Sequence, residues 1–196
     1  MAQRLPVYAC LAVSSLVLSA CANPSPSPTS SPATVTSTMA AETERAGIVP
    51  LGDADLERKT VRPQASSQLV VSDVRVGKHD GFERVVFELE GSGKPGWFIE
   101  YTDDPAQQGS GNSIKYEGNT ALEVFIDGTV YPFEIGEEVE PLGTTSGVGG
   151  TVTEVISSGT FEGHTQFTVG MKERHPFSVQ VLEEPTRVVI DIVPVG

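Results

Sequence analysis

The chain has 196 residues, of which 26 are acidic and 13 are lysine or arginine, so its formal net charge is −13. A surface with this balance repels phosphate backbones, which excludes nucleic acid as an expected partner. Hydrophobic residues make up 38% of the chain. That proportion supports one core, and the length fits a single domain with appendages.

The first twenty residues have the layout of a secretory signal peptide. Arg4 is followed by an apolar stretch from Leu5 to Leu18 and by the small residues Ser19 and Ala20. The apolar stretch is shorter than the ~20 residues that a membrane-spanning helix needs. We therefore expect residues 1–20 to be removed and the mature protein to be exported without spanning a membrane.

Cys21 follows this leader directly. The sequence Leu18-Ser19-Ala20-Cys21 resembles the lipobox of bacterial lipoprotein precursors. This resemblance implies that the Cys21 thiol receives a diacylglyceryl group and that its amine becomes the acylated (palmitate-bearing) N-terminus. Each buried CH₂ contributes ~0.8 kcal/mol, so two or more acyl chains give a firm anchor on the extracytoplasmic face of the cell membrane. An ordinary signal peptide with a chance cysteine is the alternative.

Residues 22–40 consist almost wholly of proline, serine, threonine and alanine, and residues 41–65 carry only a weak pattern. Such segments bury too little apolar area to offset the entropy of ordering. The sequence predicts a lipidated, disordered linker over 21–67 and a folded domain over 68–196. Cys10 leaves with the leader, so no disulfide is expected within the mature chain.

The folded part has a β pattern. The run "RVVFELE" (84–90) places Val85, Phe87 and Leu89 on one face, with Val86 out of step, and "RVVIDIV" (187–193) alternates in the same way. Several similar runs lie between them, separated by glycine, proline, aspartate or asparagine. This pattern predicts an all-β sandwich or barrel.

The domain also contains a weak internal duplication. Four matches are offset by 79 to 81 residues, among them "VFEL" (86–89) with "QFTV" (166–169), and a fifth pairs "VFID" (124–127) with "VVID" (188–191). We expect two similar β units that pack face to face, because neither buries its apolar face alone.

The closing run "HPFSVQVLEEPTRVVIDIVP" resembles the final hairpin of AMIN modules. The positions that carry the resemblance are Phe177, Val179, Leu182, Pro185, Arg187, Val188 to Ile190 and Asp191. With the lipobox and the spacer, the chain resembles AMIN-like lipoproteins of the actinobacterial type. The resemblance implies a two-sheet β-sandwich that recognises peptidoglycan or envelope proteins. The chain departs from the amidases of that family by having no catalytic domain and a longer middle section, about residues 103–150.

No catalytic or metal motif stands out. The histidines are His79, His164 and His175, without an H-E-x-x-H spacing, and the first two lie beside turns. The glycine-rich loops lack both G-x-S-x-G and a phosphate-loop lysine. Asp127 and Asp191 each end a strand and are expected to cap turns. We predict no enzyme activity, no metal and no cofactor.

The aromatic residues of "GWFIEYT" (96–102) are the candidate binding residues. Trp97 and Tyr101 share one strand face, and Phe98 lies on the other. An exposed Trp97–Tyr101 face would stack on sugar rings, whereas packing in the core is the alternative. The acidic run "EIGEEVE" (134–140) is interpreted as a solvated loop, with binding of a basic partner as the alternative.

Together these features predict a non-catalytic, lipid-anchored envelope protein that recognises cell-wall glycan or a wall-associated protein. A module that regulates an envelope enzyme or assembly is the second hypothesis. A hydrolase is the third, and it requires polar groups that converge in a cleft.

Overall fold

The computed structural model describes residues 49–194, which form ten β-strands and one 3₁₀ turn. In chain order these are β1 (Lys59–Val61), β2 (Gln68–His79), β3 (Phe82–Ser92), β4 (Gly96–Thr102), β5 (Thr120–Asp127), η1 (Pro132–Glu134), β6 (Thr144–Ser146), β7 (Val152–Phe161), β8 (His164–Met171), β9 (Phe177–Leu182) and β10 (Arg187–Ile192).

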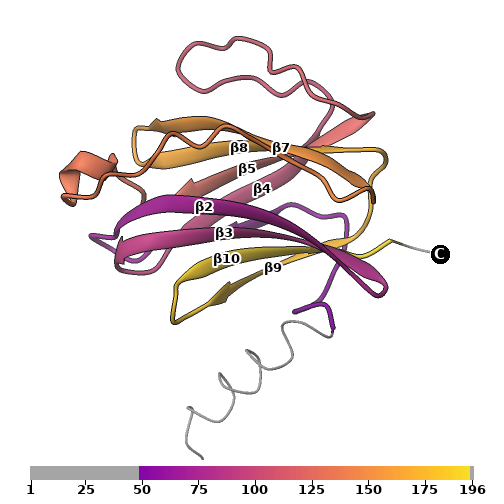
Figure 1. Ribbon diagram of the computed structural model, residues 1–196, viewed down its shortest axis with the longest axis horizontal. Coiled ribbons are helices and arrows are strands. Elements are labelled where there is room, and N and C mark those ends of the chain that lie inside the picture. The colour runs from indigo at the N-terminus through magenta and orange to yellow at the C-terminus, as the bar shows by residue number, and fades with distance from the viewer. Residues whose placement is uncertain (1–48, 195–196) are drawn as a thin grey trace, which may run out of the picture. The chain divides into compact units, whose positions relative to one another are not determined.

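The strands form two antiparallel sheets that lie on each other as two layers (Figure 1). The six-stranded sheet has the order β1-β4-β5-β8-β7-β6, and the four-stranded sheet has the order β2-β3-β10-β9. The prediction of a two-sheet, all-β sandwich is therefore confirmed. Within the described residues, no helix has the length and apolar character needed to cross a membrane.

The core lies between the two sheets because each strand alternates apolar and polar residues. In β3, Val85, Phe87 and Leu89 are buried as predicted. The ring of Phe87 meets that of Phe167 from β8, in the opposite sheet, with centroids 4.7 Å apart. Val86 points to the outer face of its sheet and packs with Leu51, Leu182 and Val189 in a second, smaller cluster. Val86 breaks the alternation of apolar and polar residues in β3 because this second cluster covers it on the outer face.

The strand order has the symmetry that the internal duplication predicts. The first half contains β2 to β5 and the second half contains β7 to β10, so that β2 corresponds to β7, β3 to β8, β4 to β9 and β5 to β10. If each strand is replaced by its counterpart, the order β2-β3-β10-β9 of the four-stranded sheet becomes β7-β8-β5-β4. These four strands are neighbours in that order in the six-stranded sheet. The halves differ in one respect from the expectation of two units packed face to face. Each half gives one hairpin to each sheet, so the halves are interlocked, and each completes both sheets of the other.

The domain begins before residue 68, so the predicted linker boundary is wrong for residues 49–67. Leu51 is buried, β1 pairs with β4, and the peptide of Asp55 pairs with that of Phe177 in β9. The apolar residues of this segment show little periodicity because the segment runs along the edges of both sheets and over the outer face of the four-stranded sheet. Residues 21–48, the rest of the predicted linker, lie outside the described residues.

A candidate binding cleft on the outer face of the six-stranded sheet

The predicted aromatic pair does not form a binding face. Trp97 is 9% exposed and belongs to the main core, as does the fully buried Ile99. Tyr101 packs against the same core, and its hydroxyl donates to the carbonyl of His175 at 2.6 Å and accepts from the His175 amide at 3.0 Å. The core-packing alternative is therefore correct for this face of β4. Cys21, the predicted lipidation site, lies outside the described residues.

The opposite face of β4 carries the open aromatic surface. Phe98 pairs in register with Phe125 on β5 and with Thr60 on β1. Paired residues of neighbouring strands share a face, so these three side chains form a row on the outer surface of the sheet. The two phenyl rings are half-buried, with centroids 6.1 Å apart, and the Arg58 guanidinium lies 5.3 Å from the centre of the Phe98 ring.

A cleft of about 750 Å³ lies over this row. Its lining residues are Thr60, Arg62, Pro63, Phe98, Gln108, Phe125, Asp127, Gly128, Gly163 and His164. The size lies within the range of about 300 to 1,000 Å³ that small-molecule sites occupy, and an aromatic floor with few polar groups is typical of them.

A carboxylate and an imidazole form the polar end of the cleft. Asp127 ends β5 and His164 begins β8, and the two residues are register partners. The Oδ1 atom of Asp127 lies 2.6 Å from Nδ1 of His164. The side chains are 21% and 45% exposed, so both remain accessible from the cleft.

The segment 103–119 forms one wall of the cleft and covers the neighbouring part of the sheet. The backbone amide of Gln108 donates to Oε1 of the buried Gln166 at 2.9 Å. The side-chain Nε2 of Gln108 donates to the backbone carbonyl of His164 at 3.2 Å. Gln166 Nε2 in turn donates to the carbonyl of Ala106 and to Glu123 Oε1. This wall is therefore fixed to β8 and β5 through the buried Gln166 and the His164 carbonyl.

Glu123 lies beside the cleft under this segment. Burial raises the pKa of the Glu123 carboxyl, the hydrogen bond from Gln166 opposes that rise, and the nearby charge of Glu100 adds to it. Glu100 is the register partner of Glu123 on β4 and lies 3.8 Å from Arg58. Glu100 and Glu123 therefore form a second row on the outer face of the sheet, next to the row that contains Phe98 and Phe125.

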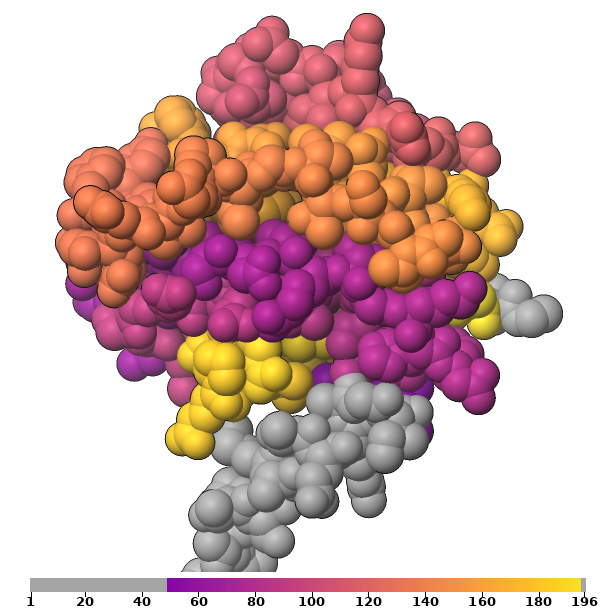
Figure 2. All heavy atoms as spheres, viewed as in Figure 1, coloured from indigo at the N-terminus to yellow at the C-terminus, as the bar shows by residue number. Residues whose placement is uncertain are grey.

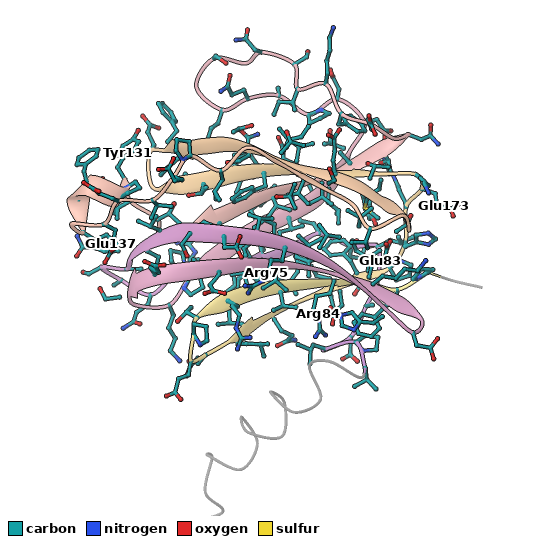
Figure 3. All side chains as sticks on the ribbon, viewed as in Figure 1. Arg75, Glu83, Arg84, Tyr131, Glu137 and Glu173 are labelled. Atoms are coloured by element: carbon teal, nitrogen blue, oxygen red, sulfur yellow. The ribbon has the colours of Figure 1, made fainter. Side chains whose placement is uncertain are left out.

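The other half of the sandwich contains an equivalent of the Asp127–His164 pair. The duplication aligns His164 with Arg84 and Asp127 with Asp191, and Arg84 and Asp191 are register partners on β3 and β10. The Arg84 guanidinium donates to both oxygens of Asp191, at 2.6 and 2.7 Å. Arg84 lies on the outer side of the four-stranded sheet (Figure 3), but it is buried together with Asp191.

The segment before β1 covers this second pair. The Leu51 amide donates to Asp191 Oδ2 at 2.6 Å, and the Ser178 hydroxyl donates to the carbonyl of Leu51. Asp191 therefore holds a buried ion pair and a backbone amide, and the expectation that it caps a turn is wrong. Asp127 likewise pairs with His164 across two strands.

The sequence singles out Phe98, Asp127 and His164 among the residues that line the cleft, but it predicts neither the cleft nor its other lining residues. Phe98 was correctly placed opposite Trp97, but strand alternation alone does not say which face is inside. His164 lies beside the β7–β8 turn, as predicted, and the alignment of "VFID" with "VVID" matches its partner Asp127 to Asp191. Among residues 49–194, no group of three or more His, Cys, Asp or Glu side chains is arranged to hold a metal ion.

Comparison with protein families identifies the class of the domain. The model of the AMIN-like domain matches residues 69–194, which is most of the described chain. The chain therefore belongs to the AMIN-like domain family, as the closing hairpin predicted. Membership indicates an envelope-associated module related to peptidoglycan. Neither the curated proteins nor the solved structures contain a significant match.

Proposed function

We propose that this protein is a lipid-anchored, non-catalytic envelope protein that binds the glycan strands of peptidoglycan in the cleft above Phe98 and Phe125. The observation that carries the proposal is an accessible aromatic row inside a cleft with a polar end, on a domain of a peptidoglycan-related family. Sugar rings present C–H faces that stack on aromatic rings, and their hydroxyl and acetamide groups take hydrogen bonds from the edges.

The polar residues of the cleft fit a neutral, hydroxyl-rich ligand. Asp127 offers its second carboxylate oxygen beside the floor and His164 offers its imidazole Nε2, and Gln108 and Thr60 add an amide and a hydroxyl. Binding through stacking and hydrogen bonds needs no net positive surface. This mode suits a chain whose net charge is −13.

The same residues favour binding over hydrolysis. Glycoside hydrolysis generally needs two carboxyl groups across the bond, roughly 5 to 9.5 Å apart. Among the described residues that line the cleft, Asp127 is the single carboxylate, and it is engaged by His164. The lining residues also include no serine or cysteine for a nucleophilic mechanism.

A co-sedimentation assay with purified sacculi tests the glycan proposal. The chain from Ala22 onward, which keeps every described residue, is expected to pellet with sacculi. A Phe98→Ala/Phe125→Ala double variant is expected to remain in the supernatant. Because both rings are partly buried, its melting temperature is expected to fall, and circular dichroism at the assay temperature checks that the variant is still folded. Phe133→Ala, an exposed aromatic residue outside the cleft, is the matched control and is expected to pellet like the parent. Equal pelleting of the parent and the double variant contradicts the proposal.

The anchor is tested separately, by expressing the full chain with Cys21→Ser. The parent is expected in the membrane fraction with a diacylglyceryl-modified N-terminus in its mass spectrum, and the variant is expected to be unmodified. A parent with a bare N-terminus contradicts the anchor and leaves the glycan site to be judged on its own assay.

A further inference from the structure

The segment between β5 and β6 carries a second exposed aromatic surface at the end of the sandwich where Tyr131 and Glu137 lie (Figure 3). Its base is fixed to both sheets. The Val130 amide donates to the carbonyl of Leu69 in β2 at 2.8 Å, and the amides of Gly128 and Thr129 donate to the carbonyl of Gly163. The segment stands at the left edge of the molecule in Figure 2.

We name residues 131–140 the aromatic knob. Local hydrogen bonds define its conformation: the Glu134 amide donates to the carbonyl of Tyr131, and the Tyr131 amide donates to Glu134 Oε1, both at 2.9 Å. Gly136, at φ +77°, closes the turn after η1, and the Glu137 amide donates to the carbonyl of Pro132. The knob is thus ordered before any partner binds, which lowers the entropy cost of association.

The knob exposes its aromatic side chains. Phe133 is 77% exposed and Tyr131 is 41% exposed, and the rings stack with centroids 5.5 Å apart and an angle of 7° between their planes. Phe133 has the largest exposed fraction among the big hydrophobic side chains of the described chain. A stacked, fixed pair of rings offers a flat apolar surface to a partner.

Four other aromatic rings of the described chain have a cation of the chain itself close to the ring face. Arg58 lies over Phe98, Lys59 over Phe177, Arg84 over Phe82 and Arg174 over Tyr101, at 5.1 to 5.7 Å from the ring centres. Over residues 49–194, neither Tyr131 nor Phe133 has such a cation. Residues 116–163 contain no lysine, arginine or histidine at all, so nothing nearby in the sequence supplies one.

The carboxylates of the knob are also left without cations. Elsewhere on the surface, Glu88 pairs with Arg75, Asp103 with Arg174 and Glu183 with Lys94. In the described part of the chain, no ion pair includes Glu134, Glu137, Glu138 or Glu140, all of which are exposed. An uncovered aromatic pair and unpaired carboxylates on one fixed turn form a surface complementary to cationic side chains.

We propose that the aromatic knob docks a basic segment of another envelope protein, with an arginine or lysine side chain over the exposed rings and further cations on Glu137 and Glu138. This inference is independent of the glycan site, because the knob lies outside the residues that line the cleft. A second copy of this chain is a poor occupant, since two chains of net charge −13 repel each other.

Fluorescence anisotropy with the chain from Ala22 onward tests the docking surface. The probe is a fluorescein-labelled decapeptide of alternating arginine and glycine, titrated at 50 and 150 mM salt. Phe133→Ala, which leaves every charge in place, is expected to weaken binding about fivefold through loss of the cation–π contact. Glu137→Gln/Glu138→Gln is expected to weaken it about as much, mainly at the lower salt concentration.

The control is Glu90→Gln/Glu162→Gln, which removes the same charge from exposed positions outside the knob. It is expected to change the affinity by less than about twofold. Equal losses in the knob and control variants, or no loss in Phe133→Ala, would assign binding to the overall charge and overturn the proposal. A parent chain that dimerises in sedimentation, with Phe133→Ala monomeric, would overturn it in favour of a second copy. Phe98→Ala/Phe125→Ala is expected to bind the peptide normally, which separates this outcome from that of the glycan site.

Discussion

The Arg84–Asp191 and His164–Asp127 pairs hold equivalent places in the two interlocked halves, yet only one of them is accessible. Both join the central strands of a sheet on its outer face. Residues 49–55 cover the first pair, and Leu51 packs beside it. The second borders an open cleft. The comparison shows one duplicated position that an extra segment covers in one half and that stays accessible in the other. Under the proposed function, the covered pair stabilises the fold and the accessible pair contacts the glycan.

Removing one partner of each pair separates these roles most strongly. Asp191→Ala leaves the buried Arg84 guanidinium without its carboxylate and the Leu51 amide without its acceptor, so we expect a loss of about 3 to 5 kcal/mol in the free energy of unfolding. Asp127→Ala affects a partly exposed pair and is expected to cost less than about 1 kcal/mol. Urea denaturation of the two variants measures both values. Similar losses would contradict the division of roles.

The covering segment itself is expected to contribute the next largest effect. Leu51→Ala removes a buried side chain from the cluster with Leu182 and Val189, which is expected to cost about 2 kcal/mol, at the low end for such a change because the cluster is small. Leu56→Ala, at the exposed position directly after this segment, is the control and should change stability by less than about 0.5 kcal/mol. If both substitutions are neutral, the segment does not stabilise the fold.

On the open side, the expected effect is on binding. His164→Ala removes the imidazole at the polar end of the cleft and is expected to weaken binding to sacculi about threefold, close to the energy of one ordinary hydrogen bond. Because His164 is partly exposed, the melting temperature should fall by no more than about 3 °C. A variant that loses several kcal/mol of stability and keeps its affinity would place His164 in the framework instead.

The smallest expected effect is a pH dependence at Glu123. Its pKa is raised in the folded state, so the folded protein binds this proton more tightly than the unfolded chain, and the ionised carboxylate lowers stability at neutral pH. Glu123→Gln keeps an oxygen for Gln166 and is expected to raise the melting temperature by about 1 to 2 °C at pH 7. The gain should vanish below about pH 4, where the unfolded carboxyl is protonated as well. A gain that is equal at both pH values would contradict this cause.

The fold could be predicted from the sequence to a large extent because strand alternation and the duplication are local signals. Val85, Phe87 and Leu89 face the core as their spacing predicts, and the closing hairpin has the predicted partners. The site could not be predicted in the same way. Alternation separates Trp97 from Phe98 but does not say which of them faces the opposite sheet.

Two further features depended on contacts that no short pattern records. Residues 49–55 lie on the four-stranded sheet through Leu51 and Asp191, which are 140 positions apart. The wall of the cleft depends on the contact between Gln108 and Gln166, and the polar side chain of Gln166 alone gives no reason to expect its burial. Long-range polar contacts of this kind decide which half of the sandwich stays open.

The most direct test of the central claim is an NMR titration of the ¹⁵N-labelled chain from Ala22 onward with soluble glycan strands released from peptidoglycan by an amidase. The account predicts shifts that saturate at Phe98, Phe125, Gln108 and His164, and no shifts at Arg84 and Asp191. Shifts at the covered pair with none in the cleft, or no shifts at any glycan concentration, would contradict it.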